Sequence, residues 1–248
     1  MAMGHPGWEW RTVLRHRAPL RWMHWINAVC LLALVGSGLQ VLNAHPALYW
    51  GETSDFAHPV LAFRDGIPGW TTIPGYRSLA LGRRWHFFFA WLWVINGACY
   101  LAWSLASRHL RDDLAPGRAD WRGIGRSVLD HLRFRHPQGE AALRYNPLQK
   151  LAYLGVVFVL APLAILTGLS MSPQLDTVLG GWLQLVGGRQ SARTLHFGAM
   201  ALFMLFFAVH LLMVVYAGPL NHVRAMLTGR LRVRWPRADA DAGEGGDG

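Results

Sequence analysis

The sequence predicts an all-α membrane protein, a bundle of four transmembrane helices with both termini in the cytoplasm. Three observations support this fold class. The chain contains four apolar stretches, each long enough to cross a hydrocarbon core of about 30 Å. Of its 248 residues, 52% are hydrophobic and 15% are charged. The net charge of +10 comes almost entirely from arginines that flank the apolar stretches, a pattern that favours membrane topology over nucleic-acid binding.

The four predicted spans cover about residues 20–41, 84–105, 147–171 and 194–216, and with their loops they form one domain over residues 19–228. Pro162 is expected to kink the third span. A polar segment, residues 1–18, precedes this domain. Residues 229–248 carry arginines followed by acidic residues and glycines, a composition that predicts a disordered tail.

The distribution of basic residues sets the predicted orientation. Counting those in the first turn of an adjoining span, eighteen of the 24 lysines and arginines belong to the two terminal segments and the loop between the second and third spans, and six belong to the other two loops. Because cytoplasmic segments carry the excess of positive charge, both termini are expected to face the cytoplasm.

Four histidines lie inside the predicted spans. His196 and His210 are fourteen residues apart in the fourth span. On a helix this spacing is about 1400°, within about 40° of four full turns, so both rings point to nearly the same side. His24 begins the first span and His86 begins the second. The predicted topology therefore gives two pairs at matched depth: His86 with His196 near the outer surface, and His24 with His210 near the cytoplasm.

This arrangement suits two b-type haems, each held by two axial histidines. A single membrane histidine could simply form a hydrogen bond to a neighbouring helix, but four of them in two depth-matched pairs favour ligands. No C-x-x-C-H motif is present, so haem would bind without covalent attachment. The two cysteines, Cys30 and Cys99, are too few for a thiolate metal site.

The motifs around these histidines resemble those of the bacterial di-haem cytochrome b family, which includes cytochrome b561 and the b-type subunits of nickel–iron hydrogenase and formate dehydrogenase. The similarity covers about residues 15–228. Its specific parts are R-x-x-H-W at 21–25, the histidine that opens the second span, H-x13-H in the fourth span, and YNPLQK at 145–150. The resemblance implies that the four paired histidines are the haem ligands.

The resemblance also implies a function and a place in the cell. Electrons would pass between a periplasmic redox subunit and quinone in the cytoplasmic (inner) membrane, as part of a respiratory chain. The protein would be an electron-transfer subunit rather than a catalytic subunit by itself. The long loop at 42–83, with LYWGE at 48–52, is more similar to relatives that work with periplasmic molybdenum oxidoreductases of the thiosulfate reductase type.

Three arginines and one asparagine complete the candidate site. Arg21, Arg84 and Arg193 each lie within three residues of a candidate ligand. They could pair with haem propionates, Arg84 and Arg193 being the favoured two, or extend to lipid headgroups. By resemblance Asn146 is a quinone-site residue, but Asn146 and Gln149 also form a capping-box pattern at the start of the third span.

Glycines at 36, 38, 168 and 198 lie within the spans. They could bring a flat haem close to the backbone or allow close helix packing.

Two other functions fit parts of the pattern. A stand-alone quinone reductase could use a small donor such as superoxide, although the large outer loop favours a protein partner. A haem-free metal ion transporter would use histidines together with carboxylates, whereas no Asp or Glu lies in any predicted span.

Overall fold

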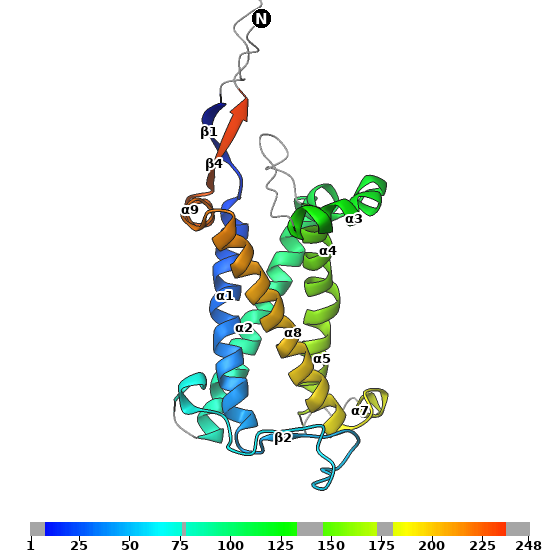
Figure 1. Ribbon diagram of the computed structural model, residues 1–248. Coiled ribbons are helices and arrows are strands. Elements are labelled where there is room, and N and C mark those ends of the chain that lie inside the picture. Colours follow the sequence, from blue (N-terminus) through cyan, green and yellow to red (C-terminus); the bar gives the residue numbers. More distant parts are fainter. Residues whose placement is uncertain (1–7, 76–77, 133–145, 173–180, 237–248) are drawn as a thin grey trace, which may run out of the picture.

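Four long helices form an elongated bundle, as predicted (Figure 1). The computed structural model describes residues 8–75, 78–132, 146–172 and 181–236. Three of the helices are continuous: α1 (Ala18–Leu42), α2 (Leu79–Ala106) and α8 (Arg189–Tyr216). The fourth consists of α4 (Pro147–Gly155), a π-helical turn (Val156–Leu160) and α5 (Ala161–Ser170). All four are long and apolar enough to cross a membrane, which confirms the predicted fold class.

A π-helical turn lies just before Pro162, where the sequence predicts a kink. Proline has no N–H group and cannot donate to the carbonyl four residues earlier. The chain widens by one residue over Val156–Leu160, and the N–H of Ala161 donates to the carbonyl of Val156. A single wide turn of this kind is a common way to interrupt an α-helix.

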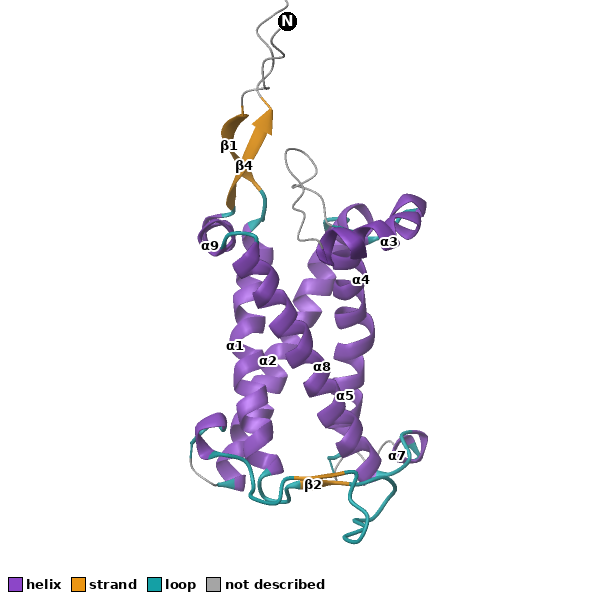
Figure 2. Ribbon diagram, in the orientation of Figure 1, coloured by secondary structure: helices purple, strands orange, loops and turns teal. Residues whose placement is uncertain are grey.

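The short elements gather at the two ends of the bundle (Figure 2). We call the end that carries the described terminal segments the inner end. It holds β1 (Trp8–Leu14), a second π-helical turn (Leu110–Leu114), α3 (Arg118–Leu132), α9 (Pro219–Thr228) and β4 (Arg230–Pro236). The outer end holds β2 (Ala47–Leu48), β3 (Leu61–Ala62), a 3₁₀ turn (Gly69–Thr71) and α7 (Trp182–Leu185).

The two terminal segments pair as an antiparallel ribbon, which corrects our prediction of disorder from residue 229. Seven residues of β1 pair with seven of β4. Apolar residues alternate along β4 at Leu231, Val233 and Trp235, which is the period of a strand with one buried face. Leu231 and Val233 pack with Ala225 of α9. Residues 237–248 lie outside the described part of the chain.

The loop between α1 and α2, which we call the outer loop, binds the first turn of α8, and this helix is longer than predicted. The backbone N–H groups of Gln190 and Ser191 donate to the carbonyl of Gly51 at 3.0 and 3.2 Å, which satisfies donors that a helix start leaves free. Gly188 precedes the helix with φ of +98°, and a Cβ on it would lie 2.7 Å from the Gly51 carbonyl oxygen. α8 therefore starts at Arg189, before the predicted 194.

A buried amide joins α1 to α2. The side-chain nitrogen of Asn96 donates to the carbonyl of Met23 at 3.0 Å and to the side-chain oxygen of Asn27 at 2.8 Å. Polar groups inside a bilayer need such partners, because lipid offers no competing hydrogen bonds. The neighbouring Ile95 points outward and is 57% exposed.

Replacing Asn96→Ala should destabilise the bundle by about 1 kcal/mol, because both hydrogen bonds from the Asn96 side chain to α1 are lost. Equilibrium unfolding in detergent measures the change. Ile95→Ala is the matched control on the outward face and should have a smaller effect. Equal stability of Asn96→Ala and the wild-type protein would show that this contact contributes nothing.

Candidate functional site

Two pairs of histidines face each other inside the bundle. At the outer end, the ring centroids of His86 on α2 and His196 on α8 are 6.1 Å apart. At the inner end, the rings of His24 on α1 and His210 on α8 are also 6.1 Å apart. The structure thus brings together the four histidines in the two pairs that the sequence predicts.

These separations fit one iron between the members of each pair. An imidazole nitrogen binds a first-row metal ion at about 2 Å, and the ring centroid lies about 1 Å behind that nitrogen. Two rings on opposite sides of one iron would therefore have centroids about 6 Å apart. The donor set, two neutral imidazoles, is also one that haem iron accepts.

The outer histidine on α8 has a defined tautomer. Its Nδ1 lies 2.9 Å from the carbonyl oxygen of Ala164 and 3.1 Å from the hydroxyl of Thr167, both on α5. A carbonyl can only accept a hydrogen bond, so the Nδ1 of His196 carries the proton and donates. In a neutral imidazole the other nitrogen, Nε2, then holds the free electron pair that binds a metal.

The outer histidine on α2 is held in the same way by α1. The Nδ1 of His86 lies 3.1 Å from the hydroxyl of Ser37, and the backbone of Leu34 also forms a hydrogen bond to this ring. The hydroxyl of Ser37 itself donates to the carbonyl four residues earlier, Ala33, at 2.6 Å. Each outer histidine is therefore bonded to a hydroxyl and to a backbone group of one neighbouring helix.

Two of the four glycines noted in the sequence lie against these rings. A Cβ on Gly38 would lie 3.3 Å from Cε1 of His86, and one on Gly168 would lie 3.2 Å from Cε1 of His196. Both distances are tighter than an ordinary contact, so a side chain here would push on the ring. Gly36 instead faces Ile73, and a Cβ on Gly198 would meet nothing within 4 Å.

Aromatic rings position the inner pair. Trp25 contacts His24 edge to face at 5.4 Å, and Phe206 stacks on His210 at 6.2 Å with an angle of 15° between the rings. The indole nitrogen of Trp25 donates to the carbonyl of Met226 in α9 at 3.2 Å. This bond fixes the start of α1 beneath α9.

An apolar layer lies between the two pairs. Ala199 and Phe203 follow His196 on α8 at spacings of three and seven residues, on the helix face that carries both histidines. They pack with Leu160, and Trp93 of α2 contacts the ring of Phe203 at 5.6 Å. The pairs therefore form two separate sites rather than one cluster.

The three candidate arginines have different surroundings. Arg193 donates to the backbone carbonyl of His45 and, at 3.4 Å, to the side chain of Gln190, so it helps to hold the outer loop. Arg84 is exposed. Arg21 donates to the carbonyl of Leu227 at the end of α9. The assignment of Arg84 and Arg193 to propionates stays a prediction.

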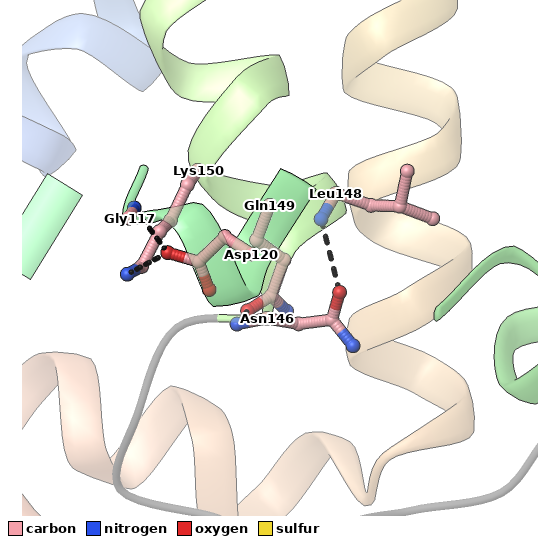
Figure 3. Close-up of polar contacts among 6 residues, drawn as sticks. All are labelled: Gly117, Asp120, Asn146, Leu148, Gln149 and Lys150. Carbon is pink, nitrogen blue, oxygen red and sulfur yellow. Dashed lines mark hydrogen bonds and ion pairs between the residues drawn. The ribbon is translucent and has the colours of Figure 1, made fainter. Parts of the chain in front are cut away.

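Asn146 caps α4 (Figure 3). Its side-chain oxygen accepts from the N–H of Leu148 at 3.0 Å, and the side chain of Gln149 accepts from the N–H of Asn146 at 3.2 Å. The hydroxyl of Ser127 in α3 also bonds to that side-chain oxygen. The predicted capping box is therefore present. The quinone-binding role of Asn146 stays a prediction.

An ion pair beside this cap connects α3 to α4. Lys150, the only lysine of the chain, lies 3.0 Å from Asp120, which also accepts from the N–H of Gly117 at 2.8 Å (Figure 3). The bonds from Gly117 and Lys150 lower the pKa of Asp120 below its ordinary value. This carboxylate therefore stays ionised at neutral pH and anchors the inner end of α4.

Ser37 and Thr167 were not among the site residues predicted from the sequence. Both precede a glycine inside an apolar stretch, as Ser37-Gly38 and Thr167-Gly168. The repeated pattern of a hydroxyl followed by a glycine at membrane depth is a signal that could have found them. Their partners on the neighbouring helices could not be read from the sequence alone.

Comparison with known proteins adds a family. A family model described as prokaryotic cytochrome b561 matches residues 15–229. The chain is 30% identical over 212 residues to YedZ1 of Azospira oryzae, a proposed protein-methionine-sulfoxide reductase subunit, covering 85% of this chain and 89% of that protein. It is 25% identical over 229 residues to a proposed Ni/Fe-hydrogenase B-type cytochrome subunit of Cupriavidus necator, covering 88% and 82%.

Replacing Thr167→Val should weaken haem binding at the outer pair about tenfold, because the hydroxyl that helps to orient His196 is lost at constant shape. Haem retention during dilution measures the change. Ser170→Ala is the matched control, since the hydroxyl of Ser170 on the same helix donates to the carbonyl of Leu166 at 2.7 Å within that helix. Equal haem loss in both variants would contradict the orienting role of Thr167.

Proposed function

Because this chain belongs to the prokaryotic cytochrome b561 family of membrane electron-transfer proteins that bind b-type haem, we propose that it is the membrane subunit that carries electrons between a periplasmic oxidoreductase and the quinone pool through two haems. The observation that supports two haems is the equal separation, 6.1 Å, of the two histidine pairs. The protein is then an electron-transfer subunit in the bacterial inner membrane.

In this proposal His86 and His196 hold the outer haem, and His24 and His210 hold the inner one. When bound, haem would supply a one-electron redox centre at each pair. The protein supplies the rest. The carbonyls and hydroxyls of α1 and α5 fix the outer rings with Nε2 free, and Trp25 and Phe206 position the inner rings. Two histidines for each haem would leave no ligand position for oxygen, which suits electron transfer.

The proposed orientation of the bundle in the membrane rests on the distribution of its arginine residues. The ribbon of β1 and β4, α3 and α9 share the inner end, and they belong to the arginine-rich segments of the chain. By the positive-inside rule this end faces the cytoplasm. The outer loop then faces the periplasm, close to the pair formed by His86 and His196.

The outer loop supports docking of a redox partner. Its shape is fixed, because Asn43 exchanges hydrogen bonds with the backbone of Ile67 at 3.1 and 3.0 Å and the loop is bonded to the start of α8. Trp50, Phe56 and Trp70 nevertheless expose 57%, 76% and 87% of their surface. Exposed aromatic residues on a preformed surface are typical of protein interfaces.

Both relatives are named as oxidoreductase subunits, one of a protein-methionine-sulfoxide reductase and one of a Ni/Fe-hydrogenase. This supports a redox subunit as the partner of the present chain. We propose a periplasmic molybdenum oxidoreductase for this partner, since the outer loop with its LYWGE segment is similar to relatives that work with such enzymes. An apolar docking surface also suits a protein better than a small charged donor such as superoxide.

We place quinone at the inner end, beside Asn146. The side-chain oxygen of Asn146 caps α4, and its amide nitrogen could donate to a quinone carbonyl. Asp120 and Lys150 hold α3 against this position, and Trp121 and Ile124 line a small recess with Pro147.

Replacing His196→Ala should lower the haem content from two to one per chain, because the outer iron loses an axial ligand. Haem quantified per purified chain measures this. The control is His58→Ala, since His58 is an exposed loop histidine paired with Asp55 at 3.0 Å, and this variant should keep two haems. Two haems in His196→Ala would remove His196 from the ligand set.

Replacing Asn146→Asp separates the two roles of this residue. Aspartate caps a helix as well as asparagine does, but it lacks the amide donor. We expect unchanged thermal stability and a loss of quinone reduction of tenfold or more. Asn146→Ala, which also removes the cap, should lower stability by about 1 kcal/mol. Full quinone turnover in Asn146→Asp would exclude the amide from the quinone site.

A further inference from the structure

A group of basic side chains lies at the inner end, beside the pair formed by His24 and His210. His16 lies near enough to Arg15, Arg21, His24 and His222 for their charges to interact. His222 likewise interacts with His210. Every group that acts electrostatically on His16 is basic. Arg15 and Arg21 supply the fixed positive charge of this cluster, and no described carboxylate acts on His16.

Two nitrogens of this cluster are buried without a hydrogen-bond partner among the described residues: Nδ1 of His16 and Nε of Arg21. A buried N–H that stays unpaired costs about 1–3 kcal/mol, and more when the group is charged. Native proteins rarely leave such groups without a partner. Nε of Arg21 always carries a proton, and Nδ1 of His16 carries one in one of its two neutral tautomers, so the two atoms fit a ligand that accepts hydrogen bonds and carries negative charge.

The surrounding backbone holds both residues in place. The N–H groups of Arg15 and His16 donate to the carbonyl of Gly229 at 2.8 and 3.2 Å. Arg21 donates from Nη1 to the carbonyl of Leu227. A Cβ on Gly229 would lie 2.8 Å from the carbonyl oxygen of His16 and 3.7 Å from the central carbon of the Arg21 guanidinium. Gly229, between α9 and β4, therefore lies against both His16 and Arg21.

The position of Arg21 on α1 places it close to His24. It precedes His24 by three residues, so both side chains lie on one face of the helix, one turn apart. His24 faces His210 across the bundle. A haem held by this pair would bring its propionate groups within reach of one turn of α1. Arginine pairs with carboxylates through two parallel hydrogen bonds, so a propionate here would give the unpaired Nε of Arg21 a partner.

We propose that Arg21, with His16 beside it, binds a propionate carboxylate of the inner haem. This inference rests on the proposed function, since it requires haem at His24 and His210. In this arrangement Arg21 contributes the charge, and the ring of His16 contributes a hydrogen bond. The shared chemistry is an oxyanion, and the phosphate of an anionic lipid is the competing source.

The test is a redox titration of the purified full chain. Replacing Arg21→Gln removes the charge that neutralises the propionate, and an unneutralised carboxylate favours ferric over ferrous haem. One of the two haems should become about tenfold harder to reduce, equivalent to about 59 mV for a one-electron couple. Arg21→Lys keeps the charge and should restore most of the potential. Repeating Arg21→Gln in a His196→Ala background assigns the shift to the inner haem.

Arg17→Gln is the matched control. Arg17 is exposed at the start of the same helix, so the variant makes the same charge change outside the cluster and should leave both potentials unchanged. Equal potentials in wild-type protein and Arg21→Gln would overturn the inference. A shift that appears in nanodiscs of phosphatidylglycerol but not of phosphatidylcholine would also overturn it, in favour of a lipid phosphate. Wild-type protein without haem would instead refute the proposed function.

Discussion

The structure depends on the hydrogen bonds that fix the outer histidines to neighbouring helices. Ala164 and Thr167 accept from Nδ1 of His196, and Ser37 with Leu34 does the same for His86. In a membrane no water replaces these partners. Each bond therefore sets the tautomer of the ring and, at the same time, the register between two helices. The glycines beside the rings, Gly38 and Gly168, let the helices approach closely enough for these bonds to form.

The two ends of the bundle differ in structure and in the role that we propose for each. At the outer end a long loop is bonded to the start of α8 and exposes aromatic side chains, which suits a stable contact with another protein. At the inner end the terminal strands, α9 and α3 surround the start of α1 and α4 with arginine and capping groups. The apolar layer that contains Ala199 and Phe203 lies between the outer and the inner histidine pairs.

The sequence predicts what depends on long-range periodicity. Four apolar stretches set the four helices, and the spacing of His196 and His210 with the alternating direction of the spans set both histidine pairs. It does not predict what depends on contacts across the chain. The strand over Arg230–Pro236 forms because β1 and α9 offer it a partner and a face. The early start of α8 depends on the carbonyl of Gly51, and the roles of Ser37 and Thr167 depend on rings carried by other helices.

The most direct test of the central claim is a reduced-minus-oxidised visible spectrum of the purified protein, with haem quantified per chain. Two histidine pairs that each hold one iron predict a low-spin b-type spectrum and two haems per chain. A colourless protein would contradict haem binding and would favour the alternative of a haem-free metal ion transporter. A single haem per chain would mean that one of the two pairs, in spite of its 6.1 Å separation, holds no iron.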